Sequence, residues 1–174
     1  MWETIAFLAG SALITWYSWP SLNKPRSYGF YRFFAWELIW GLCLLNLRGW
    51  FVDPWSWHQI LSWILLVLSL YLVASGVVLL RRAGRPQGPL EATLRLVQDG
   101  PYRYIRHPLY ASLLCLAWGV FFKSPSILDG CLSVVATAFI FATGRADEAE
   151  CLARFGQEYA AYIMRTHMFI PFIF

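Results

Sequence analysis

The chain has 174 residues, of which 59% are hydrophobic and only 14% are charged. Soluble globular domains carry about 25% charged residues, so this composition excludes an ordinary soluble domain and indicates an integral membrane protein. The formal net charge is +4. Basic residues at the headgroup surface of a membrane account for a charge of this size, so we expect no nucleic-acid partner.

Five apolar runs follow one another along the chain. A helix that crosses the hydrocarbon core of a bilayer needs roughly 20 apolar residues. The first run has no basic segment before it and no small-residue cleavage site after it, which favours a membrane anchor over a removable signal peptide. The last two are short and adjacent, which favours a tight helical hairpin. The runs are residues 4–19, 31–47, 58–80, 108–122 and 127–143.

This pattern predicts an all-α fold, namely a polytopic membrane bundle of about five transmembrane helices. We expect one domain over residues 1–174. The positive-inside rule gives an expected orientation. If the linker 81–107 is cytoplasmic, every lysine and arginine except Arg48 and Lys123 lies on that side. We therefore expect the N-terminus outside and the C-terminus in the cytoplasm.

The four cysteines give no sign of a metal or disulfide site. Cys43, Cys115, Cys131 and Cys151 show no CxxC spacing, and three of them lie within apolar runs. A buried cysteine is usually a small hydrophobic residue. We expect no metal site. The oligomeric state is not readable from the sequence.

Polar residues gather between the linker and the fourth apolar run, in the segment GPYRYIRHPLY at residues 100–110. Such groups are costly at a bilayer edge unless a partner, water or a ligand satisfies them. Arg106 and His107 precede Pro108 at an expected helix start. One interpretation is a snorkelling arginine with a capping histidine. The other is a ligand site, because the amides at a helix N-terminus bind anions.

The tyrosines of this segment also allow two interpretations. Tyr102, Tyr104 and Tyr110 could form an aromatic belt at the headgroup level. They could equally line a pocket that receives an adenine ring or, by cation–π attraction, a sulfonium cation.

The C-terminal region predicts a cytoplasmic amphipathic helix. From residue 146 to 164 apolar side chains recur at three- and four-residue steps. Gly156 lies inside this helix, where it could allow close approach of another backbone. Before the helix stand Arg145, Asp147 and Glu148. They are either a solvated first turn or groups that hold a ribose, an amine and an anionic substrate.

Glu37 lies within the second apolar run, where burial of a carboxylate is costly. It could snorkel, pair with Arg32 or face the bundle interior, and we keep it as a substrate-side candidate. His58 and His167 are interpreted as satisfied polar residues near the membrane surface.

Two motifs in this order resemble the isoprenylcysteine carboxyl methyltransferase family, which is related to the integral-membrane phospholipid N-methyltransferases. The first is LVQDGPYRYIRHPLY at residues 96–110. The second is the acidic pair Asp147-Glu148, followed by FGQEYAAY at residues 155–162 and by Pro171. Together the motifs cover about half of the chain.

The resemblance implies about five transmembrane helices, with S-adenosylmethionine bound by the region of about 84–174. It also implies a substrate-binding arginine before the acidic pair, for which Arg145 is the candidate. The cofactor contacts that it implies are Gln87, Leu96, Val97, Tyr102, His107, Pro108, Leu109, Tyr110, Asp147 and Glu148.

The expected function is methyl transfer to a lipophilic substrate that arrives from the bilayer. A carboxylate acceptor needs only a cation such as Arg145 to position it, whereas an amine acceptor needs a base such as Glu148. These two residues are the catalytic candidates. Three alternatives remain, namely a phospholipid N-methyltransferase of the same fold, an NADPH-dependent sterol-type reductase, and a non-enzymatic protein that binds lipid headgroups.

Overall fold

A computed structural model describes residues 2–85 and 93–171. Over these residues the chain is helical, which confirms the predicted all-α class, and it contains no strand beyond one isolated bridge. Short helical turns lie at Leu47–Gly49, Leu80–Gly84 and Gly100–Arg103. The α-helices are α1 (Trp2–Leu22), α2 (Tyr28–Leu45), α3 (Trp57–Leu79), α4 (Pro108–Phe121), α5 (Ile127–Phe155) and α6 (Gln157–Ile163).

Each of the five apolar runs forms one helix, and α4 and α5 form the predicted hairpin. The predicted tail helix is divided, because its first part belongs to α5 and its second part is α6. Gly156 separates them with a φ of 55° and a ψ of −127°, a conformation that L-residues rarely adopt. A Cβ at Gly156 would meet no atom of the described residues within 4 Å. The expected close approach of another backbone at this glycine is therefore wrong.

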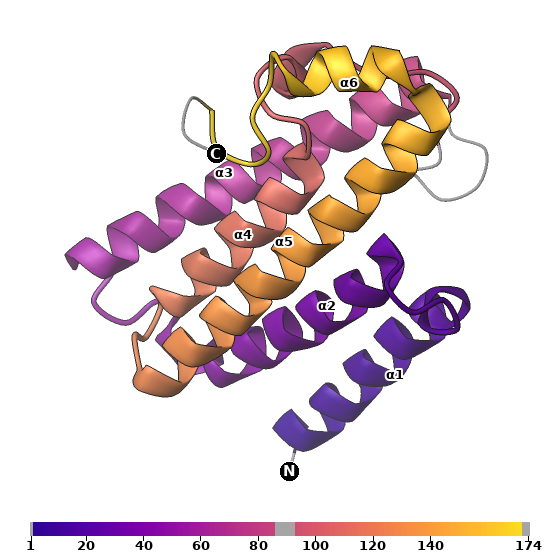
Figure 1. The fold of residues 1–174 in the computed structure, drawn as a ribbon. Helices are drawn as coiled ribbons and strands as arrows, with labels where there is room; N and C mark the ends of the chain where they lie inside the picture. The colour runs from indigo at the N-terminus through magenta and orange to yellow at the C-terminus, as the bar shows by residue number, and fades with distance from the viewer. Residues whose placement is uncertain (1, 86–92, 172–174) are drawn as a thin grey trace.

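The five long helices lie side by side in the order α1, α2, α5, α4, α3 (Figure 1). α1 packs against α2 at one edge of the bundle, and α3 packs against α4 at the other. α6 crosses the end of the bundle at which α4 begins (Figure 1). This end holds both segments that the sequence motifs mark.

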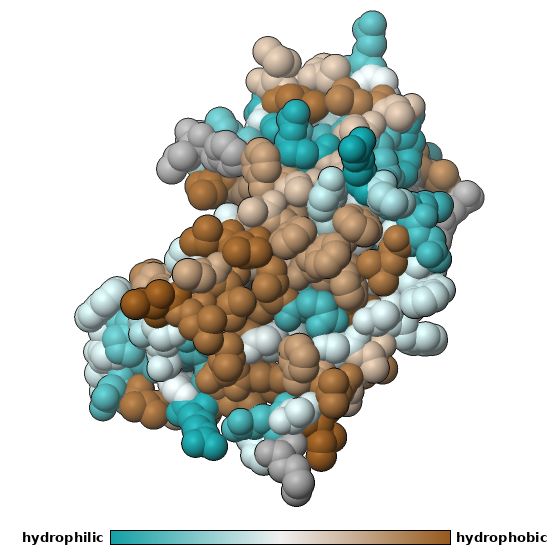
Figure 2. All heavy atoms as spheres, turned by 60° about the horizontal axis from the view of Figure 1, so that its bottom comes forward, coloured by the Kyte–Doolittle hydropathy of each residue, from teal (hydrophilic) through white to brown (hydrophobic). Residues whose placement is uncertain are grey.

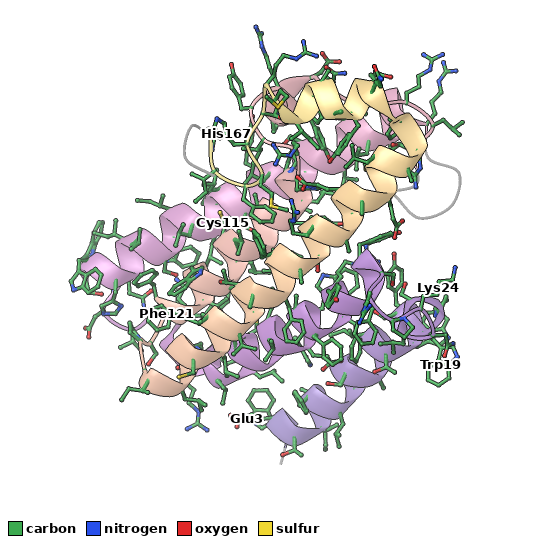
Figure 3. The ribbon with its side chains drawn as sticks, in the orientation of Figure 1. Glu3, Trp19, Lys24, Cys115, Phe121 and His167 are labelled. Carbon is green, nitrogen blue, oxygen red and sulfur yellow. The ribbon has the colours of Figure 1, made fainter. Side chains whose placement is uncertain are left out.

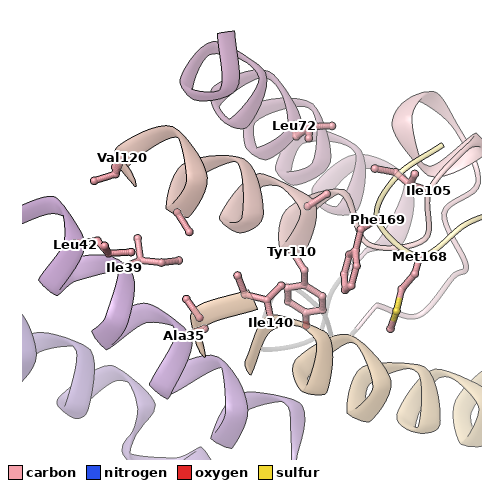
Figure 4. Packing of buried hydrophobic residues seen from close by; sticks show 13 residues of the cluster. Ala35, Ile39, Leu42, Leu72, Ile105, Tyr110, Val120, Ile140, Met168 and Phe169 are labelled. Atoms are coloured by element: carbon pink, nitrogen blue, oxygen red, sulfur yellow. The ribbon is translucent and has the colours of Figure 1, made fainter. Parts of the chain in front are cut away.

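The core lies where α2, α4 and α5 meet (Figure 4). Ala35, Ile39 and Leu42 are spaced by four and three residues, so they form one buried stripe along α2. They face Val120 of α4 and Ile140 of α5 in the same cluster. Small and branched residues on these faces let the helices approach closely.

Polar side chains fasten α3 to α4 inside the bundle. Ser62 donates a hydrogen bond to the carbonyl of Gly119 at 2.6 Å, and Ser69 donates one to the carbonyl of Ser112 at 2.8 Å. At the end opposite α6, the buried Lys123 donates to Gln59 at 3.1 Å. Its ammonium lies 3.5 Å from the centre of the Trp63 ring. These contacts make α3 and α4 a firmly joined pair.

The surface suits a membrane environment. Hydrophobic side chains cover much of the middle of the face in Figure 2, and hydrophilic ones gather toward its ends. In the described part of the chain, two helices are long and apolar enough to cross a membrane, Trp57–Gly84 and Ile127–Phe155. α4 is apolar but has only 14 residues. Length and composition thus support two of the expected five crossings.

Candidate active site

The segment before α4 is shaped by two local signals. Gly100 has a φ of 58°, and Pro101 follows it at the start of the turn Gly100–Arg103. Pro108 is the first residue of α4, where a missing N–H costs nothing. Between them Tyr102 and His107 turn inward, with 6% and 5% of their surface exposed. The segment therefore presents an aromatic ring and an imidazole to the interior.

The chain after α6 holds this segment in place by backbone hydrogen bonds. The N–H of His167 donates to the carbonyl of Tyr104 at 3.0 Å, and the N–H of Arg106 donates to the carbonyl of His167 at 2.7 Å. The N–H of His107 donates to the carbonyl of Met168 at 3.2 Å. This short parallel pairing brings together two stretches that are far apart in sequence.

Arg106 forms a buried ion pair with Glu148 of α5. Its Nε lies 2.7 Å from Oε1 of Glu148, and the two side chains are 11% and 5% exposed. Arg106 also donates to the carbonyl of Thr166. The second carboxylate oxygen of Glu148 lies 3.2 Å from the guanidinium of Arg145, which is 66% exposed. Glu148 is thus held by one buried and one exposed arginine.

His107 lies between the two acids of the α5 pair. Its Nδ1 is 3.4 Å from Oδ2 of Asp147, and its Nε2 is 3.7 Å from Oε1 of Glu148. The second distance is too long for a hydrogen bond, and within the described residues Nε2 has no such partner. Tyr110 stacks on the imidazole, with ring centres 5.3 Å apart.

Burial alone lowers the pKa of His107, but the two carboxylates outweigh it and raise the pKa above its ordinary value. A raised pKa means that this histidine stabilises the fold fully below its unfolded pKa of about 6.5 and loses that contribution as the pH rises through the folded pKa.

We therefore expect the detergent-solubilised protein to melt at a lower temperature near pH 8 than near pH 6. His107→Gln removes the titrating group, so its melting temperature should change less over the same interval. Thermal unfolding followed by intrinsic tryptophan fluorescence measures both proteins. An equally steep pH dependence in the variant would assign the effect to other groups.

A narrow cavity opens beside His107 and Tyr110. Its volume is about 60 Å³, which is room for a few water molecules. Among the described residues, Asp147 supplies a carboxylate to the cavity lining and Arg106 supplies a guanidinium. Burial raises the pKa values of Tyr159 and Tyr162, so both phenols stay protonated, and Tyr162 donates its hydrogen bond to the carbonyl of Tyr102. The remaining lining residues are Leu80, Thr93, Leu96, Val97, Tyr102, Leu109, Cys151 and Phe155.

The structure brings together most of the residues that the sequence marked as cofactor contacts. Leu96, Val97, Tyr102, His107, Leu109, Tyr110 and Asp147 all line this cavity. Pro108 starts α4 and is buried beside it. Glu148 stands behind the lining, at the ion pair. Gln87 lies outside the described residues.

Two substrate-side candidates lie apart from the cavity lining. Arg145 points largely into solvent and reaches the site only through Glu148. Glu37 accepts a hydrogen bond from Ser11 of α1 at 2.6 Å, at the edge of the bundle. Neither residue lines the cavity.

Sequence reasoning missed the roles of Arg106 and of several tail residues. The snorkelling interpretation of Arg106 is wrong, because the side chain turns inward to Glu148. Of the three tyrosines assigned to a possible belt, only Tyr104 is exposed. The tail residues Cys151, Phe155, Tyr159 and Tyr162 line the cavity, and their helical spacing was the signal that could have found them.

One end of the helical bundle thus holds a buried cluster of two acids, an arginine and a histidine. The sequence pattern of the phospholipid methyltransferase family matches residues 57–158, more than half of the chain. The chain belongs to this family.

One curated relative is Methanethiol S-methyltransferase 1 of Bradyrhizobium diazoefficiens, which is 32% identical over 72 residues. The match covers 40% of this chain and only 24% of the relative, so it concerns about a quarter of the relative's length. No solved structure matches significantly.

Proposed function

We propose that this protein is an S-adenosylmethionine-dependent methyltransferase that acts on a lipophilic, membrane-borne acceptor. The observation that carries the proposal is a buried cavity lined by both motif segments, with His107 from one and Asp147 from the other. Membership of the phospholipid methyltransferase family supports methyl transfer as the reaction class.

The donor set of the cavity fits S-adenosylmethionine, which supplies a methyl group on a sulfonium. Asp147 provides a carboxylate for hydroxyl or amino groups, and the tyrosines provide aromatic faces for a ring or a cation. The buried Nε2 of His107, which lacks a hydrogen-bond partner among the described residues, is ready to meet a polar group. The cavity is smaller than this molecule, so binding requires its walls to move apart.

In methyl transfer the main task of the protein is to position the acceptor atom against the methyl group. A methyl group moves from a sulfonium by in-line displacement, which needs the reacting atoms about 3–3.5 Å apart and water excluded. Both carboxylate oxygens of Glu148 already face an arginine. This supports a positioning role for Glu148, in which it orients Arg106 and His107. The exposed Arg145 is free to turn toward an anionic acceptor.

The acceptor class remains a choice among a carboxylate, an amine and a thiol. The resemblance to the isoprenylcysteine carboxyl methyltransferases favours a carboxylate, positioned by Arg145. The name of the curated relative favours a thiol. An amine acceptor would define a phospholipid N-methyltransferase.

Five membrane crossings by α1 to α5, with the cavity at the cytoplasmic surface, complete the proposal. α1 has 21 residues and α2 has 18, which suits a bilayer of about 30 Å at the helical rise of 1.5 Å per residue. The distribution of basic residues supports the orientation.

The test is isothermal titration of the detergent-purified protein with S-adenosylhomocysteine, with His107→Ala alongside. We expect micromolar binding, weakened at least about tenfold in the variant because a buried polar contact and an aromatic stack are lost. Binding of NADPH without S-adenosylhomocysteine would support a reductase. Binding of neither ligand by folded protein would support a headgroup-binding protein.

A further inference from the structure

A polar hollow lies on the surface between the turn Gly100–Arg103 and the end of α6. Its volume is about 400 Å³. It shares one described lining residue with the cavity beside His107, namely Tyr162, which is 3% exposed. We call it the arginine hollow. Its lining residues are Gln98, Asp99, Arg103, Tyr162 and Arg165.

Arg103 and Arg165 give the arginine hollow its chemistry. Both side chains are exposed, and within residues 2–85 and 93–171 neither guanidinium lies within 4 Å of a carboxylate. The Nε of Arg165 donates to the carbonyl of Ala161 at 3.3 Å. Two guanidiniums and the carboxylate of Asp99 leave one net positive charge among the lining residues. That charge matches a phosphodiester, and guanidinium donors suit phosphate oxygens.

Hydrogen bonds fix the two segments that carry these arginines against each other. The hydroxyl of Tyr162 donates to the carbonyl of Tyr102. The N–H of Arg165 donates to the carbonyl of Tyr162 at 3.1 Å. The N–H of His167 donates to the carbonyl of Tyr104, and Figure 3 shows His167 close to the end of the bundle that α6 crosses. Because the backbones are already in place, a ligand between the arginines orders little more than their two side chains.

The arginine hollow lies where a membrane surface would meet the bundle. The two helical stretches that are long and apolar enough to cross a bilayer both end on the side that α6 crosses (Figure 1). Tyr104, 51% exposed, follows Arg103, and Met164, 85% exposed, precedes Arg165. Arginines beside exposed apolar or aromatic side chains are typical of surfaces at the headgroup level. A lipid headgroup therefore fits the hollow better than a phosphate compound dissolved in water.

We infer that the arginine hollow binds the phosphate of an anionic phospholipid, with Arg103 and Arg165 on the phosphate oxygens. The inference does not depend on the cofactor or on the methyl acceptor, because neither arginine lines the cavity beside His107. The bound lipid joins the turn Gly100–Arg103 to the end of α6. Since it binds only the folded arrangement of these two segments, it stabilises the fold.

Two double variants that remove the same charge test this inference. Arg103→Gln with Arg165→Gln takes both guanidiniums from the hollow. Arg81→Gln with Arg82→Gln removes two exposed arginines that follow α3 at the same end of the bundle and do not line the hollow. General attraction between basic residues and an anionic membrane falls equally in both variants. A loss confined to the first variant is therefore assigned to the hollow.

The measurement is native mass spectrometry of the detergent-solubilised full chain with phosphatidylglycerol and phosphatidylcholine of equal chain length. We expect the native protein to retain phosphatidylglycerol at least about tenfold more tightly than phosphatidylcholine. The variant at Arg103 and Arg165 should lose that preference, and the variant at Arg81 and Arg82 should keep it within roughly threefold. Thermal unfolding shows that each variant folds. Phosphatidylglycerol should raise the melting temperature of the native protein but not of the first variant.

Asp99→Asn gives a prediction of the opposite sign. The carboxylate of Asp99 lines the same hollow and repels a phosphate bound there. Its removal should therefore tighten the binding of phosphatidylglycerol by about two- to fivefold. The same mass spectrometry measures this change.

Three results would overturn the inference. Equal effects of the two double variants would leave only general charge attraction. Weaker lipid binding in Asp99→Asn, with phosphatidylcholine held as tightly as phosphatidylglycerol by the native protein, would assign the hollow to a headgroup that carries a cation. Displacement of phosphatidylglycerol by an equal concentration of glycerol phosphate would assign the hollow to a soluble phosphate compound.

Discussion

Arg106→Met should destabilise the protein by about 3–5 kcal/mol, because it leaves the buried carboxylate of Glu148 without its closest counter-charge. The melting temperature should fall by roughly 6–20 °C for a chain of this size. Arg145→Met is the matched control, since this arginine contacts the same carboxylate from a largely exposed position. Solvent screens such a contact, so its loss should cost at most about 1 kcal/mol.

A double variant separates lost charge balance from lost packing. Replacing Arg106 and Glu148 together by Met removes both charges, and buried ion pairs exchanged for apolar residues often leave stability unchanged or higher. We expect the double variant to recover much of the stability lost in Arg106→Met. Thermal unfolding in detergent measures all three proteins. Equal destabilisation by Arg106→Met and Arg145→Met would contradict the assigned ion pair.

Asp147→Asn should weaken binding of S-adenosylhomocysteine by about 10- to 100-fold, because hydrogen bonds to a charged group are worth about 1.5–3 kcal/mol. Asp147 is the carboxylate that lines the cavity, and it also faces Nδ1 of His107. The side chain keeps its size, so the fold should persist. Isothermal titration gives the two dissociation constants.

Glu150→Gln is the control for Asp147→Asn. Glu150 lies on the same helix, one turn nearer α6, and does not line the cavity. Its replacement should change the dissociation constant less than about threefold, since Glu150 makes no contact with the cavity and the substitution keeps its size. Similar losses in both variants would show that net charge, rather than a contact with Asp147, governs binding.

The helices could be predicted from the sequence because their signal is local. Residues 108–122 and 127–143 are apolar runs that end at polar or turn-forming residues, and α4 and α5 begin where those runs begin. The end of α5 could not be placed, since apolar spacing continues through residue 164 and only the backbone conformation at Gly156 divides the helix.

The parts of the candidate site that form contiguous sequence motifs could be predicted, whereas contacts between residues far apart in the sequence could not. The segment 96–110 and Asp147 could be found because their order and spacing form motifs. The partner of Glu148 could not, because Arg106 lies 42 residues away and an arginine beside a helix start has a simple alternative as a snorkelling residue. Likewise nothing in the sequence links His167 to Tyr104, which meet through a backbone hydrogen bond.

The pairing of His167 and Met168 with the segment before α4 has a consequence for biosynthesis. During translation α3, α4 and most of α5 can enter the bilayer while the partners of Tyr104 and Arg106 are still unsynthesised. Until residues 166–168 emerge, the carbonyl of Tyr104, the N–H groups of Arg106 and His107 and the Arg106 guanidinium must be hydrated or bound by other factors. Assembly of the candidate site is therefore a late event, and if the proposed function holds, nascent chains stalled before residue 166 should not acquire affinity for S-adenosylhomocysteine.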